Sequence, residues 1–144
     1  MNDQIRKEIQ IEASREKVFH AISNPEKVVL WFPETLEGKY EVGEQAVFGF
    51  GEQGKAQILV VDSKPYSYFS YRWVPGANHF LGDLTQTQTT LVEFQIEEIS
   101  ENSCKLILTE SGFNSIPEKI RSDAFKQNSG GWDFMLGRLS DFLK

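Results

Sequence analysis

The sequence predicts an α+β fold in which a curved antiparallel sheet wraps around one long C-terminal helix, in the order β-α-α-β-β-β-β-β-β-α. Two observations carry this prediction. Between residues 45 and 110, successive segments alternate apolar and polar side chains, which is the period of half-buried strands. Residues 132–143 instead carry apolar side chains at helical spacing, which predicts an amphipathic helix with one face against the sheet.

Length and composition indicate one domain, residues 1–144, of an ordinary soluble protein. The net charge of -6 disfavours a nucleic-acid-binding surface. No apolar run is long enough to span a bilayer, so we expect no membrane insertion. A single cysteine excludes an intrachain disulfide, and the first residues do not resemble a signal peptide. We therefore expect a cytoplasmic protein.

The first elements are a strand and two short helices. Residues 5–11 alternate between apolar and polar side chains, which predicts a half-buried strand. Ser14 is a typical N-cap, and apolar residues at helical spacing follow it, so a helix is expected to begin there. Asn24 followed by Pro25 has the pattern of a second helix start, because proline is tolerated in the first turn.

Five later segments have the pattern of strands: residues 45–50, 55–64, 66–73, 89–99 and 104–110. Alternate side chains of a strand point to the same face of a sheet. The alternation therefore gathers large apolar residues and one carboxylate on one face: Ala46, Phe48, Phe50, Phe69, Tyr71, Trp73, Thr90, Val92, Phe94, Ile96, Cys104, Leu106, Leu108 and Glu110. We expect this face to contact the long helix.

The long helix is expected to begin within residues 116–123, because Ser115 and Glu118 fit a capping box. This start places Gly130 and Gly131 inside the helix, where each glycine costs about 1 kcal/mol relative to alanine. We hypothesise that both glycines face the sheet where the helix crosses a cavity, with Trp132 closing one end.

A cavity is expected because a curved sheet and a straight helix of about 30 Å cannot touch along their whole length. Aromatic side chains with a few polar groups are the usual lining of a small-molecule site. The alternative is that the same rings simply fill the core. The candidate cavity residues are Trp31, Phe48, Phe50, Tyr71, Trp73, Phe80, Phe94, Leu108, Glu110, Phe113, Gly131, Trp132 and Met135.

Two motifs are better explained by structure than by chemistry. Residues 49–54, GFGEQG, match a dinucleotide-binding loop, but a strand pattern follows where that loop needs a helix, so we expect a hairpin turn. His20, His79 and Cys104 lack the spacing of a metal site or of a cysteine–histidine nucleophile pair. We expect no metal and no cofactor.

Glu110 is the one candidate for acid–base chemistry. A carboxylate among inward-facing residues needs a partner or has its pKa raised, so it could orient a ligand or act as an acid or base. The alternative is that it lies at the solvated end of its strand. Arg72 could be its partner only if a bulge turned it inward. No motif for covalent catalysis is present, so no catalytic residue is assigned.

Four segments carry a resemblance to a known superfamily: residues 9–32, 60–73, 108–113 and 130–143. They resemble the START-like helix-grip (SRPBCC) superfamily, and within it the proteins similar to the activator of the heat-shock-protein-90 ATPase. The resemblance implies an incomplete antiparallel barrel that grips the C-terminal helix around a hydrophobic cavity. It also implies that many members bind lipids, polyketide-like rings or hormones, while a minority are enzymes.

Three functions follow as hypotheses. The first is binding of a small, largely hydrophobic molecule in the cavity, and the second is an enzyme that uses the same pocket with Glu110 as acid or base. The third is a chaperone-interacting module, although the second domain of the full-length co-chaperone is not found here. We expect a monomer or a weak homodimer.

Overall fold

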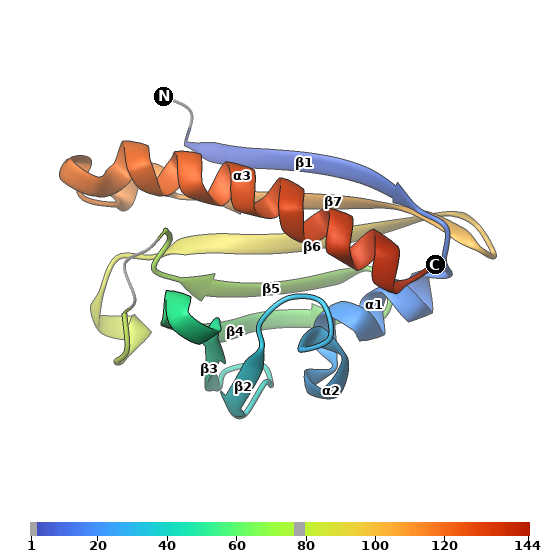
Figure 1. Cartoon of the computed structure of the whole chain (residues 1–144), viewed down its shortest axis with the longest axis horizontal. Helices are drawn as coiled ribbons and strands as arrows, with labels where there is room; N and C mark the ends of the chain where they lie inside the picture. Colours follow the sequence, from blue (N-terminus) through green and yellow to red (C-terminus); the bar gives the residue numbers. More distant parts are fainter. Residues whose placement is uncertain (1–2, 77–79) are drawn as a thin grey trace.

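The computed structural model describes residues 3–76 and 80–144. Seven antiparallel strands form one sheet in the order β1-β7-β6-β5-β4-β3-β2 (Figure 1). The strands are β1 (Gln4–Ile11), β2 (Thr35–Gly38), β3 (Gln45–Gly49), β4 (Lys55–Lys64), β5 (Tyr68–Trp73), β6 (Thr90–Ser100) and β7 (Ser103–Ser111). Since β1 pairs with β7, the first strand of the chain lies beside the last one.

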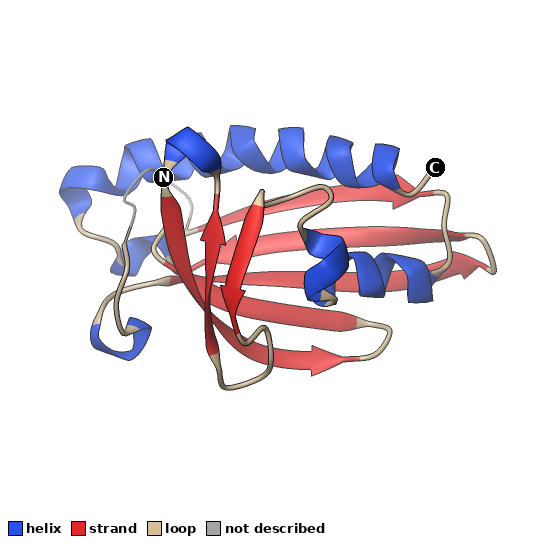
Figure 2. Ribbon diagram, turned by 60° about the horizontal axis from the view of Figure 1, so that its bottom comes forward, coloured by secondary structure: helices blue, strands red, loops and turns tan. Residues whose placement is uncertain are grey.

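Three α-helices pack against this sheet. α1 (Arg15–Ser23) and α2 (Pro25–Val28) follow β1, and α3 (Glu118–Phe142) follows β7. Figure 1 shows α3 running obliquely along β1 and β7, with its C-terminal end near α1, and Figure 2 shows the sheet curving below it. Apolar residues of all three helices join the inward-facing side chains of the strands in one buried cluster. The predicted architecture is confirmed.

The caps of the first two helices are also confirmed. The Ser14 hydroxyl accepts from the Lys17 backbone N–H at 3.2 Å, and the Asn24 side-chain oxygen accepts from the Glu26 N–H at 2.8 Å. α3 begins inside the predicted interval, but the capping box at its start is wrong. Ser115 ends the short 3₁₀ helix η3 (Phe113–Ser115), and its hydroxyl donates to the Gly112 carbonyl at 2.7 Å instead.

The glycine-rich loop is a strand-to-strand connection, as predicted. β3 ends at Gly49, the 3₁₀ helix η1 (Gly51–Gln53) follows, and β4 begins at Lys55. The short edge strand β2 has no alternating pattern, which is why its residues cannot be located from the sequence. Within the described residues, no helix has both the length and the apolar character needed to cross a membrane.

Candidate functional site

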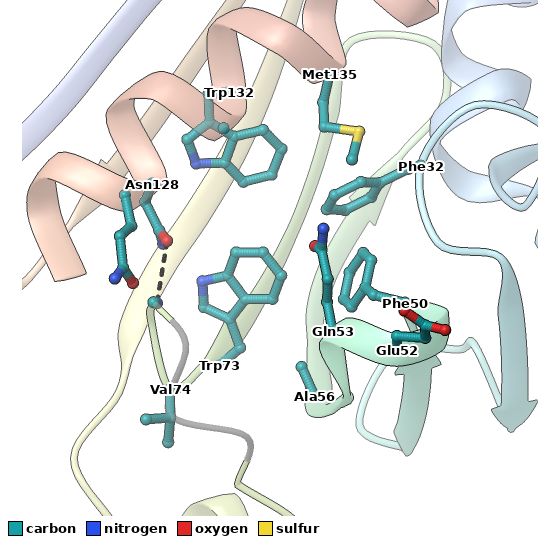
Figure 3. Close-up of a pocket in the computed structure, with 13 residues that line it drawn as sticks. Phe32, Phe50, Glu52, Gln53, Ala56, Trp73, Val74, Asn128, Trp132 and Met135 are labelled. Atoms are coloured by element: carbon teal, nitrogen blue, oxygen red, sulfur yellow. Dashed lines mark hydrogen bonds between the residues drawn. The ribbon is translucent and has the colours of Figure 1, made fainter.

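A pocket of about 500 Å³ lies between α3, the end of β5 and the turn η1, and it is partly open to solvent (Figure 3). Three segments far apart in the sequence form it: the turn η1 after β3, the end of β5 and the middle of α3. The lining residues are Phe32, Phe50, Glu52, Gln53, Ala56, Trp73, Val74, Gly76, Gln127, Asn128, Gly131, Trp132 and Met135.

Four aromatic rings form the wall of the pocket. Trp73 on β5 and Trp132 on α3 are stacked, with ring centroids 5.7 Å apart and 29° between their planes. The Phe32 ring lies 5.3 Å from Trp132 and 5.6 Å from Phe50, centroid to centroid. Figure 3 shows both indole nitrogens on the side of Asn128 and both phenylalanine rings on the opposite side.

The indole rings of Trp73 and Trp132 are held in place by hydrogen bonds to one carboxylate, that of Glu110. Trp73 Nε1 donates to Glu110 Oε2 at 2.8 Å, and Trp132 Nε1 donates to Glu110 Oε1 at 2.8 Å. Thr90 Oγ1 donates to Oε2 at 2.5 Å, and Asn128 Nδ2 lies 2.9 and 3.0 Å from the two oxygens. An indole N–H can only donate. The arrangement therefore presents donors to both oxygens, as an ionised carboxylate requires.

Sheet register explains why these groups meet. Trp73 is paired with Thr90 on β6, and the neighbouring inward position of β6, Val92, is paired with Glu110 on β7. Three adjacent strands thus place an indole, a hydroxyl and a carboxylate on one face. α3 supplies Asn128 and Trp132, which are four residues apart and so lie on the same side of the helix.

Glu110 points inward, as one of the two sequence-based alternatives expected, and the other alternative and the Arg72 pairing are wrong. Glu110 is 0% exposed, so it does not lie at a solvated strand end. Arg72 is not its partner, because Arg72 is on the opposite face of β5 and its guanidinium donates to the Thr89 hydroxyl at 3.4 Å. The four side chains that donate to Glu110 are uncharged. Among the described residues, the carboxylate is therefore satisfied without an ion pair.

Asn128 also holds the loop that follows β5. Its Oδ1 accepts from the Gly76 backbone N–H at 3.0 Å, while its Nδ2 donates to Glu110. Gly76 has φ +79, and a Cβ there would come within 3.0 Å of Ala124. Only glycine fits this approach of loop to helix. The sequence places Asn128 on the sheet-facing side of the helix but gives no sign of its two partners.

Five of the predicted cavity residues line the pocket: Phe50, Trp73, Gly131, Trp132 and Met135. Six others lie in the core and not on the pocket wall: Trp31, Phe48, Tyr71, Phe94, Leu108 and Phe113. Their side chains fill much of the space between the sheet and α3, and the pocket is lined instead by residues from the middle of α3, the end of β5 and η1. Phe80 is half-buried outside the wall, where its carbonyl accepts from the Gln57 N–H at 3.1 Å.

The adjacent glycines Gly130 and Gly131 of α3 differ in position. Both are exposed, but Gly131 is on the lining of the pocket and Gly130 is not. A Cβ at either residue would meet no described atom within 4 Å. Both glycines lie inside the helix, as predicted, but Gly130 does not face the sheet.

One buried polar group near this site has no partner among the residues that the structure describes. The Tyr71 hydroxyl is buried and unpaired. Burial raises the pKa of Tyr71 well above its usual value, and the nearby Tyr40 and Glu110 raise it further. Tyr40, by contrast, donates to the Ile22 carbonyl at 2.9 Å.

The remaining candidates stay apart from the pocket. Cys104 is buried, and its thiol donates to the Ala13 carbonyl at 3.5 Å. Burial raises the pKa of that thiol, with Glu12 and Glu98 adding to the effect. His20 is exposed beside Phe19 and Tyr66, and His79 lies outside the described residues. Among the described residues, no three His, Cys, Asp or Glu side chains are grouped to hold a metal ion.

The fold and the pocket define a helix-grip domain, with a curved sheet around a long helix and a pocket between them. A family model described as "Activator of Hsp90 ATPase homolog 1-like protein" matches residues 12–144. The chain therefore belongs to this family of the SRPBCC superfamily. No curated protein matches the sequence significantly.

Solved structures with the same fold include DynU16, from the dynemicin biosynthetic locus, at a TM-score of 0.78 and 22% identity. That match covers 99% of this chain but 48% of DynU16, so the chain spans about half of its length. The Aha1 dimer from Colwellia psychrerythraea has a TM-score of 0.74, 21% identity and coverage of 97% and 95%. PFC0360w, an HSP90 activator from Plasmodium falciparum, has a TM-score of 0.74, 16% identity and coverage of 99% and 96%. At these identities the likeness concerns the fold.

Proposed function

We propose that this protein binds a small, largely apolar molecule in the pocket between α3, β5 and η1. The observation that carries the proposal is the wall of four aromatic rings around about 500 Å³ of space. Small-molecule sites have volumes of roughly 300–1,000 Å³ and mostly apolar linings with a few fixed polar groups. Here the polar groups are Glu52, Gln53, Gln127 and Asn128.

Preorganisation of the wall supports this proposal. The indoles of Trp73 and Trp132 are held by hydrogen bonds to one buried carboxylate, so little side-chain freedom is left to lose when a ligand enters. Membership in the family also agrees with it, because the superfamily resemblance implies ligands in the same part of the fold. A cytoplasmic location and a single domain belong to the proposal as well.

Glu110 contributes to binding as a positioning residue. Its two oxygens already accept from four donors, and its side chain is fully buried. A general acid or base must reach the proton that it transfers. We therefore favour binding over catalysis for this pocket.

The experiment uses the two glycines as a matched pair. Protein purified directly from cells is analysed by native mass spectrometry, bound species are extracted, and the affinity of the extracted compound is measured. Gly131→Leu fills the pocket and is expected to weaken binding about tenfold or more. Gly130→Leu adds the same side chain beside the pocket and is expected to bind as the parent does. Equal binding by both variants contradicts the proposed site.

A chaperone contact is the second candidate, favoured by the description of the family itself. The test adds the purified protein to Hsp90 and measures ATP hydrolysis and co-sedimentation. A raised rate or a complex supports the contact, and the absence of both removes it. Sedimentation of the protein alone distinguishes the expected monomer from a weak homodimer.

A further inference from the structure

The lining of the pocket carries negative charge and no positive charge among the residues that the structure describes. Of the thirteen described lining residues, Glu52 is the only charged one. Below the wall lies the Glu110 carboxylate, whose four donors are uncharged. Neutral donors satisfy its lone pairs but do not cancel its net charge. Two carboxylates thus act on the pocket without a lysine or arginine in the described wall.

The aromatic rings also favour a positive charge in the pocket. The face of an aromatic ring is electron-rich and its edge electron-poor, so the face attracts cations. Trp73 and Trp132 direct their N–H edges to Glu110, and this donation increases electron density on the two indoles. Phe32 and Phe50 present two further rings across the space, as Figure 3 shows.

From this combination we infer that the ligand carries a positive charge: it is an organic cation, such as an amine or quaternary ammonium, on an apolar body. The inference rests on the proposed function and adds the charge of the ligand to it. An aromatic ring stabilises a cation that lies within about 6 Å of its centroid, most strongly where water is excluded. Acidic ligands, including carboxylates and phosphates, are disfavoured because both nearby charges repel them.

Three probes of nearly equal shape test the inference: benzyltrimethylammonium, its uncharged carbon isostere neopentylbenzene, and the anion benzylsulfonate. Binding is followed by the NMR signals of the indole N–H groups and by tryptophan fluorescence. The cation is expected to bind about tenfold more tightly than the neutral isostere, and the anion more weakly than either.

Two variants separate the contribution of the carboxylate charge from that of the aromatic rings. Glu52→Gln removes the charge at the mouth, and Phe50→Leu removes a ring while keeping an apolar side chain. Each is expected to weaken the cation about threefold or more, and to affect the neutral isostere less. Glu101→Gln removes an exposed charge in the β6–β7 turn, at the far end of these strands, and is the matched control.

The outcomes distinguish the two proposals. If the neutral isostere binds as tightly as the cation, or the anion binds best, the charge inference is overturned while ligand binding stands. If none of the probes binds, both proposals fail for ligands of this kind. A cation preference that stays at its full size in both Glu52→Gln and Phe50→Leu also contradicts the inference, because neither the Glu52 charge nor the Phe50 ring then contributes to it.

Discussion

The indole of Trp132 on α3 stacks on the indole of Trp73 on β5, and both donate to the same buried carboxylate. The contact joins the helix to the sheet at the edge of the pocket. Glu110 therefore has two effects. Its hydrogen bonds link the helix to the sheet, and they fix the orientation of the two indole rings.

Replacing Glu110 with glutamine should destabilise the protein strongly. In Glu110→Gln, an amide nitrogen would face donors that now point at a carboxylate oxygen, which leaves buried N–H groups unpaired. The expected loss is about 2–4 kcal/mol in the free energy of unfolding, measured by urea denaturation. Glu101→Gln, on the surface, should change it by less than about 0.5 kcal/mol. A loss for Glu110→Gln as small as that of the control would show that the network contributes little.

The tyrosines at positions 71 and 40 should respond oppositely to phenylalanine. Tyr71→Phe removes a hydroxyl that has no partner among the described residues, so stability at neutral pH should stay equal or rise by up to about 1 kcal/mol. Tyr40→Phe leaves the Ile22 carbonyl without its donor and should cost about 1–2 kcal/mol. Urea denaturation of both variants measures the difference. A clear loss for Tyr71→Phe would reveal a partner for its hydroxyl.

Alkaline pH should destabilise the protein through the same two tyrosines. Burial raises the pKa of Tyr71 and Tyr40 above the usual value of 10.0, so each keeps its proton in the folded state while the unfolded chain releases it. Their contribution is fully present below pH 10 and is lost as pH rises further, by about 1.4 kcal/mol per pH unit for each tyrosine. Unfolding measured in urea between pH 9 and 11 checks the slope. Tyr71→Phe should reduce it by about half, and an unchanged slope would assign the effect to other groups.

The glycines of α3 should be replaceable by alanine with a gain in stability. Neither position would bring a Cβ within 4 Å of another described atom. Gly130→Ala and Gly131→Ala should each stabilise the protein by about 0.5–1 kcal/mol through helix propensity. Thermal unfolding followed by circular dichroism measures the gain. Gly76→Ala is the contrast, since φ +79 and the contact with Ala124 predict a loss there.

The sequence predicts which face of each strand is buried, because alternation is a local property. The pattern assigns Phe48 and Phe50 to one face, and likewise Tyr71 and Trp73; the structure places all four on the inner side. Alternation does not give the depth of a residue below the helix. Phe48 and Tyr71 fill the core, whereas Phe50 and Trp73, one step further along, reach the pocket.

The polar network below the pocket cannot be predicted in the same way. The alternation identifies Glu110 as an inward carboxylate, but its donors come from β5, β6 and α3. Their meeting depends on strand register and on the position of the helix over the sheet, which are non-local. Phe32 is absent from the predicted cavity residues for a related reason, because it follows α2 and reaches the pocket only through the packing of the helices.

Because β1 pairs with β7, the order in which the chain is synthesised limits the order in which its strands can pair. Gln4 is opposite Ser111, so strand β1 finds its partner only after more than a hundred residues have been made. On the ribosome, the hairpins from β2 to β6 can form first. The apolar face of β1 stays exposed to water until β7 has been made. Contacts so distant along the chain form slowly. The pairing of β1 with β7 is thus a late step in the folding of this domain, because it needs both ends of the sheet's chain segment.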